Sequence, residues 1–283
     1  MGGRRRRPSN AAGAHYLADP KLARELVERA RVRRGDLVLD LGAGTGALTA
    51  PLLRAGANVV AIERDATLAA ALRRRFGRAE LTVVEHDLLA FALPRRPYRV
   101  VASIPFSITT ALLGRLLDPG DSSLERAVLV LEWGAARRLS AAAPADARIL
   151  WWSARYELRL GRRIAADSFS PPPRVDGAVL VAVRRVPPLV PRREQTAFAR
   201  LLTQASARHA APIAEVLRPI FSRQQLRHVL SELRLDPRIP AGRLEIEHWA
   251  AINAAMVTLV DPRRWPRGRA RWSRARPREH GSN

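Results

Sequence analysis

The chain has 283 residues, with 49 basic side chains against 26 acidic ones and a formal net charge of +23. A hydrophobic fraction of 47% is enough for a folded core, and the length suits about two domains. The absence of cysteine excludes disulfides, cysteine-ligated zinc and thiolate catalysis, and no apolar run reaches the roughly 18 residues of a membrane span.

The first two thirds of the chain alternate between strand-like and helix-like hydrophobic periods. The predicted strands are 37–41, 58–62, 81–84 and 99–104, with further apolar runs at 127–131, 150–160 and 178–183. The predicted helices are 22–30, 47–55 and 66–76. Strands and helices in this alternation predict an α/β fold with a doubly wound, mostly parallel, Rossmann-like sheet.

A domain boundary is expected after Arg185, because the prolines of Val-Pro-Pro-Leu-Val-Pro cannot continue a central strand. We therefore expect one domain over 14–185 and a small all-helical domain over 186–261, where apolar residues recur at helical spacing. Residues 1–13 and 262–283 are expected to be solvated basic tails, the second with eight arginines.

Arginine supplies nearly all of the positive charge, since Lys21 is the only lysine. Such an excess indicates a polyanionic partner, because each neutralised phosphate releases counterions. A GC-rich genome would also produce scattered arginines, but it explains the clusters at both ends less well. The first residues carry no apolar segment after their arginines, so they do not form a secretory signal, and we expect a cytoplasmic protein.

A glycine-rich turn follows the first strand. Gly42, Gly44 and Gly46 stand where the chain must turn sharply and let a ligand approach the backbone. By itself such a turn indicates either a nucleotide-like ligand or only a tight connection from strand to helix. Its position at the carboxyl end of a strand favours a ligand, because open parallel sheets bind ligands there.

Polar residues end the next three predicted strands as well. Glu63 could accept hydrogen bonds from both hydroxyls of a ribose, although a lone acid there is usually a solvated charge. Asp87 could accept from the amine of an adenine or could cap a helix, and the sequence leaves both open. Ser103-Ile104-Pro105-Phe106 ends the fourth strand, where the proline turns the chain outward. The four strand ends together predict one pocket.

The order of these motifs resembles that of the S-adenosylmethionine-dependent adenine N6-methyltransferases. More closely, the chain is similar to the ribosomal RNA adenine dimethylases, the family of the Erm resistance enzymes and KsgA. Two flanking segments carry this resemblance further: Ala14-His15-Tyr16-Leu17 stands where the family has Gln-Asn-Phe-Leu, and 169–178 match its Phe-x-Pro-x-Pro-x-Val-Asp pattern. The resemblance spans 14–185 and implies a class I methyltransferase domain followed by an RNA-binding helical domain.

The resemblance also implies roles for individual residues. S-adenosylmethionine would contact the side chains or backbone of His15, Leu17, Gly42, Gly44, Glu63, Asp87 and Ser103. The target adenine would meet Ser103 and the Ile104 carbonyl as acceptors for its N6 hydrogens, with Phe106 and Phe169 as flat apolar surfaces for a flipped base. No metal is implied, and His209, His228 and His248 lack the spacing of metal ligands.

Three departures from the family pattern bear on activity. Ser103 replaces the usual Asn or Asp and keeps one acceptor without the carbonyl geometry, a change that could weaken activity or restrict the product, and the sequence leaves its effect open. His15 and Ala14 replace Asn and Gln at the entrance to the cofactor site. Phe106 replaces Tyr and loses only a hydroxyl.

We expect methylation of adenine N6 in 23S ribosomal RNA, with resistance to macrolide-lincosamide-streptogramin B antibiotics, by a monomer acting on naked RNA or an assembling subunit. Ile104 and the arginine-rich ends favour the Erm branch. A KsgA-like enzyme acting on 16S ribosomal RNA, and a catalytically weakened RNA-binding relative, remain alternatives. Trp151 and Trp152 are expected to pack in the core from a strand, whereas Trp265 and Trp272 could either stack on bases or lie in a disordered tail.

Overall fold

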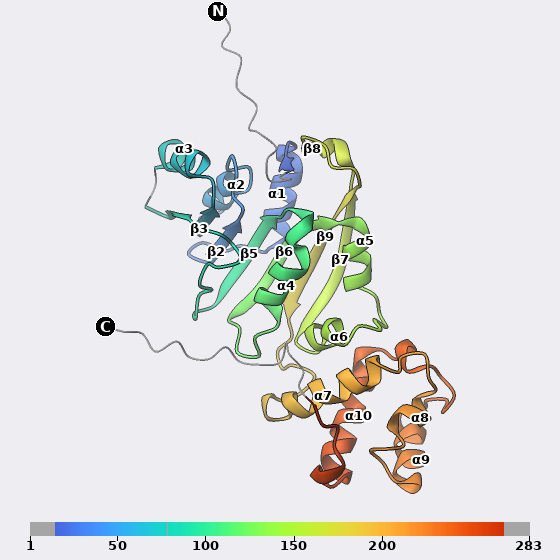
Figure 1. The fold of residues 1–283 in the computed structure, drawn as a ribbon. Helices are drawn as coiled ribbons and strands as arrows, with labels where there is room; N and C mark the ends of the chain where they lie inside the picture. Colours follow the sequence, from blue (N-terminus) through green and yellow to red (C-terminus); the bar gives the residue numbers. More distant parts are fainter. Residues whose placement is uncertain (1–14, 78, 269–283) are drawn as a thin grey trace, which may run out of the picture. The chain divides into compact units, whose positions relative to one another are not determined.

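The structure of the chain is a computed structural model that describes residues 15–77 and 79–268 (Figure 1). The strands are β1 Tyr16–Leu17, β2 Leu37–Leu41, β3 Asn58–Glu63, β4 Leu81–Glu85, β5 Tyr98–Ser103, β6 Leu124–Glu132, β7 Tyr156–Ile164, β8 Phe169–Ser170 and β9 Gly177–Arg184. The longer helices are α1 Pro20–Arg29, α2 Thr49–Arg54, α3 Ala66–Phe76, α4 Thr109–Leu117, α5 Trp133–Leu139, α6 Ala147–Ser153, α7 Gln195–Ser206, α8 Ile213–Leu217, α9 Arg223–Glu232 and α10 Ile246–Leu259.

Seven strands form one sheet in the order β4-β3-β2-β5-β6-β9-β7, and β1 pairs with β8 in a separate antiparallel ribbon. The strands β4, β3, β2 and β5 pair in parallel. Every residue of β2 is buried, as expected for a central strand that is covered on both faces. The strand order reverses between β2 and β5, and a doubly wound sheet binds its ligand at such a switch point. The predicted fold class is therefore confirmed.

Local sequence determines where the helices beside β2 and β3 begin. Asp19 caps α1 by accepting a hydrogen bond from the backbone of Lys21, and Pro20 occupies its first turn, which needs no backbone donor. Asp65 caps α3 in the same way, and Gly77 ends it in the left-handed conformation. Because Asp65 follows β3 by two residues, the cap of α3 holds the chain close to Glu63.

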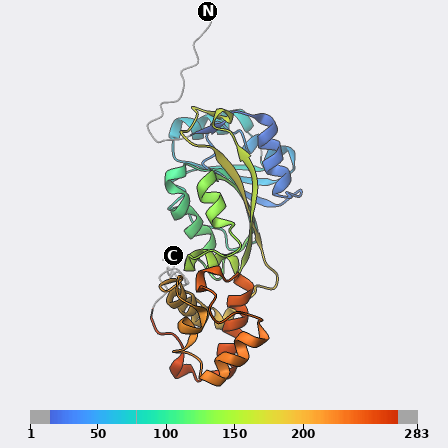
Figure 2. The same ribbon diagram turned by 90° about the vertical axis from the view of Figure 1, so that its right-hand side faces the viewer.

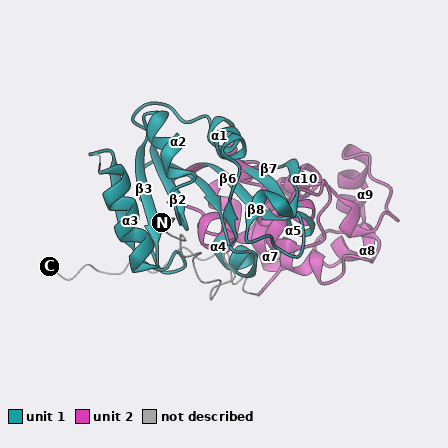
Figure 3. Ribbon diagram, turned by 90° about the horizontal axis from the view of Figure 1, so that it is seen from above, with its two compact units in different colours: residues 1–112, 126–136, 160–181 teal, residues 113–125, 137–159, 182–283 magenta. Residues whose placement is uncertain are grey.

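The chain divides into two compact units (Figure 3). Unit 1 comprises Met1–Leu112, Arg126–Ala136 and Leu160–Val181, and unit 2 comprises Leu113–Glu125, Arg137–Arg159 and Ala182–Asn283. The units therefore divide β6, β7 and β9 between them, whereas the sequence suggests one boundary after Arg185. The parallel strands β2 to β5 and helices α1 to α3 belong to unit 1.

The last part of unit 2 contains helices and no strand within its described residues 186–268, drawn mainly in orange and red in Figure 2. Apolar side chains of α7 and α10, including Phe198 and Trp249, are fully buried. Ser222 begins α9 with a capping box: Ser222 Oγ accepts from the Gln225 backbone N–H, and Gln225 Oε1 accepts from the Ser222 backbone N–H. The apolar residues that recur at helical spacing in this part of the sequence are the ones that pack between its helices. Among the described residues, no helix is both long and apolar enough to cross a membrane.

The structure corrects the expected position of two tryptophans. Trp151 and Trp152 lie in α6, not in a strand, although both are buried as expected. Asp146 caps α6, and both indole N–H groups donate to Asp118, one to its backbone and one to its carboxylate. A short apolar run buried on all sides has no period that separates strand from helix, so the sequence pattern was ambiguous there.

The predicted tail at 262–283 is only partly described. Trp265 donates from its indole N–H to the Val260 carbonyl at 2.9 Å and is partly buried, so it packs close to the end of α10. Trp272 and the remaining arginine-rich segment lie outside the described residues, as does the predicted tail at 1–13.

Candidate active site

The glycine turn after β2 adopts backbone conformations that favour glycine. The φ angles of Gly42, Gly44 and Gly46 are +76°, +54° and +84°. A Cβ on Gly44 would lie 2.7 Å from the ring of Tyr16, which leaves no room for a side chain. A Cβ on Gly42 would meet only Leu88 at 3.7 Å, so the backbone of Gly42 is accessible to a ligand.

Glu63 is held against this turn. Its Oε2 accepts a hydrogen bond from the Gly44 backbone at 2.8 Å and its Oε1 accepts one from the Asp65 backbone at 2.9 Å. The residue is only 8% exposed. Each carboxylate oxygen can accept a second hydrogen bond, so Glu63 is oriented and still able to bind two hydroxyl groups.

Asp40 is a site residue that the sequence reasoning missed. Its Oδ2 accepts a hydrogen bond from Thr49 Oγ1 at 2.6 Å, while its buried Oδ1 has no partner among the described residues. Burial raises the pKa of the Asp40 carboxyl to about 7; the Thr49 hydrogen bond opposes this rise and the charge of Glu63 adds to it. An acid inside the apolar run Leu-Val-Leu-Asp-Leu was the signal that could have identified it.

A small cavity of about 20 Å³ joins the predicted segments. Its lining includes His15, Tyr16, Leu17, Asp40, Gly42, Ala43, Thr45, Ala47, Leu48 and Ser103. Four of the predicted cofactor residues thus line one space with Asp40, and Gly44 and Glu63 adjoin it through their hydrogen bond.

The chemistry of this lining fits S-adenosylmethionine, which carries an ammonium, a sulfonium and a ribose. Asp40 offers an unpartnered buried acceptor for a cation, and Glu63 offers two oriented acceptors for the ribose hydroxyls. The cavity is narrower than the cofactor. The Tyr16 ring lies directly on Gly44 and lines this cavity.

Of the four residues expected to meet the target base, Ser103 lines the cavity, whereas Ile104, Phe106 and Phe169 do not. Ser103 lines the cavity at the end of β5, and Ile104 is buried beside it in the chain. His15 Nδ1 lies 2.7 Å from the Pro171 carbonyl, and its ring is 6.2 Å from that of Phe106 in a tilted arrangement. The segment before α1 and the loop after β8 therefore meet next to Phe106.

Two other predicted site residues, Phe169 and Asp87, do not line the cavity. The antiparallel pairing of β1 with β8 brings Phe169 opposite Leu17. Phe169 is 3% exposed, so stacking on a base would require it to become accessible, and that role stays a prediction. Asp87 is exposed and does not line the cavity. Its Oδ1 accepts from the Leu89 backbone at 2.7 Å in a turn at 88–90, so it does not cap a helix, which was the alternative that the sequence left open. Its contact with the adenine of the cofactor also stays a prediction.

The chain is similar to known proteins over nearly its whole length. A model of the family described as "Ribosomal RNA adenine dimethylase" matches residues 7–257. An rRNA adenine N-6-methyltransferase of Bacillus licheniformis is 32% identical over 263 residues, which cover 93% of this chain and 92% of that protein. The mycinamicin-resistance protein MyrB of Micromonospora griseorubida is 32% identical over 94% of this chain and 83% of its own length.

A relative that is named for a different ribosomal RNA matches this chain at about the same sequence identity. Ribosomal RNA small subunit methyltransferase A of Synechococcus sp. (strain JA-3-3Ab) is 33% identical over 88% of this chain and 93% of its own length. Among solved structures, the 23S rRNA methyltransferase ErmE superposes with a TM-score of 0.78 at 23% identity, covering 86% of this chain and 99% of that one, which shows a shared fold. Sequence identity therefore does not separate the two targets.

Proposed function

The chain belongs to the ribosomal RNA adenine dimethylase family, and we propose that within this family it methylates N6 of an adenine in 23S ribosomal RNA and thereby confers resistance to macrolide-type antibiotics. It is an S-adenosylmethionine-dependent rRNA adenine N6-methyltransferase. The observation that carries the activity is the oriented carboxylate of Glu63 on the glycine turn, beside a cavity that also includes Ser103.

The cofactor supplies a methyl group on a sulfonium, whose departure as a neutral thioether drives the transfer. In the proposed site, Glu63 binds the ribose hydroxyls and the glycine turn lies against the cofactor through its backbone. Asp40 provides an anion that attracts the positive charge of the cofactor. Tyr16 and Leu17, from the segment before α1, cover the cofactor once it is bound.

The target nitrogen needs help because the lone pair of an adenine N6 amine is delocalised into the ring. Hydrogen-bond acceptors on its two hydrogens draw the nitrogen toward tetrahedral geometry and make the lone pair available. In the proposed site these acceptors are Ser103 Oγ and the Ile104 carbonyl, and Phe106 supports the flipped base. No covalent intermediate with the enzyme is needed.

Two observations support 23S ribosomal RNA as the target. One relative of nearly full coverage is named for resistance to mycinamicin. In addition, the isoleucine at position 104 of the Ser-Ile-Pro-Phe motif resembles the Erm branch, whereas KsgA proteins usually have leucine there. The small-subunit relatives favour 16S ribosomal RNA as the second candidate.

Expression in an antibiotic-sensitive bacterial host, followed by mapping of methylated adenines in both ribosomal RNAs, tests the proposal. We expect one new N6-methylated adenine in 23S RNA, together with macrolide resistance. The same measurement on the host without the gene is the control for background methylation. New methylation confined to 16S RNA would replace the proposal with the second candidate, and no methylation in either RNA would favour the weakened relative.

A further inference from the structure

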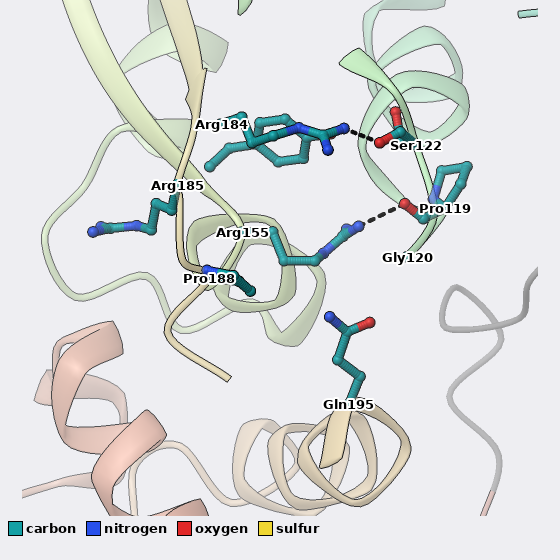
Figure 4. A pocket seen from close by; sticks show the side chains of 9 residues that line it. Pro119, Gly120, Ser122, Arg155, Arg184, Arg185, Pro188 and Gln195 are labelled. Carbon is teal, nitrogen blue, oxygen red and sulfur yellow. Dashed lines mark hydrogen bonds between the residues drawn. The ribbon is translucent and has the colours of Figure 1, made fainter. Parts of the chain in front are cut away.

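A second cavity, of about 90 Å³, lies within unit 2 and is lined by three arginines (Figure 4). Arg155 lies just before β7, Arg184 ends β9 and Arg185 follows it. None of the residues that line this cavity is an aspartate or a glutamate. A water needs roughly 10–15 Å³, so the space is sufficient for several waters or a tetrahedral oxyanion.

Arg155 forms no ion pair among the described residues, although the carboxylates of Asp118 and Asp121 lie close enough to act on its charge. The residue is only 6% exposed, and its Nε has no partner among the described residues. Its Nη1 donates to the Pro119 carbonyl at 2.6 Å and its Nη2 donates to the Leu117 carbonyl, at the end of α4. The carboxylate of Asp118 accepts instead from Arg148 and Trp152. Burial lowers the pKa of Arg155 to about 10, so the guanidinium stays charged at neutral pH.

The remaining groups around Arg155 add positive potential. Arg184 donates to the carbonyls of Leu124 and Ser122, and Arg185 donates to the Ser153 carbonyl at 2.9 Å. Of the three arginines, Arg185 is the one that forms an ion pair within the described part of the chain, with Glu247 at 3.4 Å.

The cavity also borders the beginning of a helix. Gln195 is the first residue of α7, a helix of 12 residues, and Figure 4 shows its side-chain amide directed toward Arg155. The short turn Arg192–Glu194 runs directly into α7, and the backbone N–H of Gln195 donates to the Arg192 carbonyl, so the donor that Gln195 offers to the cavity is its side-chain amide. A Cβ on Gly120 would lie 2.8 Å from Gln195 Oε1, so the glycine leaves room for the amide at the mouth of the cavity.

We propose that this arginine cavity binds a backbone phosphate of the RNA substrate, away from the methyl-transfer site. Arginine forks and amide N–H donors are the groups that bind a phosphate oxyanion. The RNA as the source of the phosphate rests on the proposed function, whereas free inorganic phosphate shares the same chemistry. A backbone phosphate carries no sequence information, so the cavity would contribute to affinity and position without selecting the target adenine.

A pair of substitutions on α7 tests the proposal without removing the buried Arg155. Gln195→Glu places a negative charge at the cavity, whereas Thr196→Glu places the same charge on an exposed neighbour that does not line it. Binding of a fluorescently labelled RNA hairpin is measured for both variants and the wild type over a range of salt concentrations. We expect Gln195→Glu to bind roughly tenfold more weakly than Thr196→Glu, with a log-log salt dependence smaller by about one.

Inorganic phosphate provides the second arm of the test. Millimolar phosphate should raise the melting temperature of the wild type and of Thr196→Glu above that in chloride of equal ionic strength, and should not raise that of Gln195→Glu. Equal RNA affinities of the two variants would overturn the proposal. This conclusion would hold even if inorganic phosphate still stabilised the wild type. Because a backbone contact is independent of sequence, methylation of 16S instead of 23S RNA would refute the proposed target and leave this result unchanged.

Discussion

Replacing Asp40 with asparagine tests whether a buried carboxyl in the cofactor site titrates near neutral pH. Asparagine keeps an oxygen that can accept the hydrogen bond from Thr49, and it removes the charge. In the wild type, burial raises the pKa of Asp40 from 3.8 to about 7. At about 1.4 kcal/mol for each pKa unit, this rise corresponds to roughly 4 kcal/mol of unfavourable free energy for the ionised form in the folded protein.

The direction of the pH dependence follows from where each state releases its proton. The unfolded chain ionises Asp40 near pH 4, whereas the folded protein retains the proton up to about pH 7. Between these values the folded state binds more protons, so the contribution of Asp40 to the free energy of unfolding falls as the pH rises and levels off above about pH 7. From about pH 5 to about pH 8, the wild type should therefore lose roughly 2–3 kcal/mol more stability than Asp40→Asn.

Urea denaturation of the wild type, Asp40→Asn and Glu232→Gln at both pH values measures this difference. Glu232→Gln removes the same charge from an exposed carboxylate at the end of α9 and should follow the wild type. Calorimetric titration with S-adenosylmethionine should also show wild-type affinity increasing through neutral pH, because the ionised carboxylate attracts the cationic cofactor. Parallel stability curves for the wild type and Asp40→Asn would refute the assigned titration of Asp40.

Three further expectations concern the proposed site and the RNA. Glu63→Gln should weaken S-adenosylmethionine binding by roughly tenfold in calorimetry, because a hydrogen bond to a charged group contributes about 1.5–3 kcal/mol; unchanged affinity would remove Glu63 from the cofactor site. Ser103→Asn should maintain or raise single-turnover methyl transfer and Ser103→Ala should lower it roughly ten- to a hundredfold, whereas equal rates for Ser103→Ala and the wild type would leave the Ile104 carbonyl as the acceptor. Deletion of 269–283, which spares Trp265 and its contact with Val260, should flatten the salt dependence of RNA binding, and an unchanged slope would show that this segment does not contact RNA.

The sequence predicted the parallel half of the sheet closely because its signals are local. Residues 66–76 form a helix with the predicted bounds, since Asp65 and Gly77 stop it at either end. The strand ends at Glu63 and Ser103 likewise follow from continuous apolar runs next to polar residues. The common edge of the sheet predicted that these strand ends form one pocket, and the resemblance to the methyltransferases added the segment at 14–17. The structure places His15, Leu17, Gly42 and Ser103 around one cavity, whereas Asp87 lies outside its lining.

The remaining features depend on contacts that no local pattern contains. Asp40 is a site residue because β2 buries it while leaving one oxygen unpartnered, and spacing alone does not reveal the orientation of an acid inside a strand. The arginine cavity joins segments as distant as Gly120 and Gln195. In a chain with 48 arginines, the sequence offers no way to distinguish Arg155 from the many solvated ones. Its burial and the lack of an ion pair among the described residues distinguish it only in the folded protein.

The position of β9 in the sheet has a consequence for how the protein is made. This strand is the last of the sheet to be synthesised, yet it lies between β6 and β7. While the chain emerges from the ribosome, β6 and β7 therefore expose unpaired edges until residues 177–184 arrive, whereas β2 to β5 can pair as soon as they are made. A nascent chain truncated before Gly177 would lack the strand that joins β6 to β7, so the edges of both strands that face β9 would stay open to other chains.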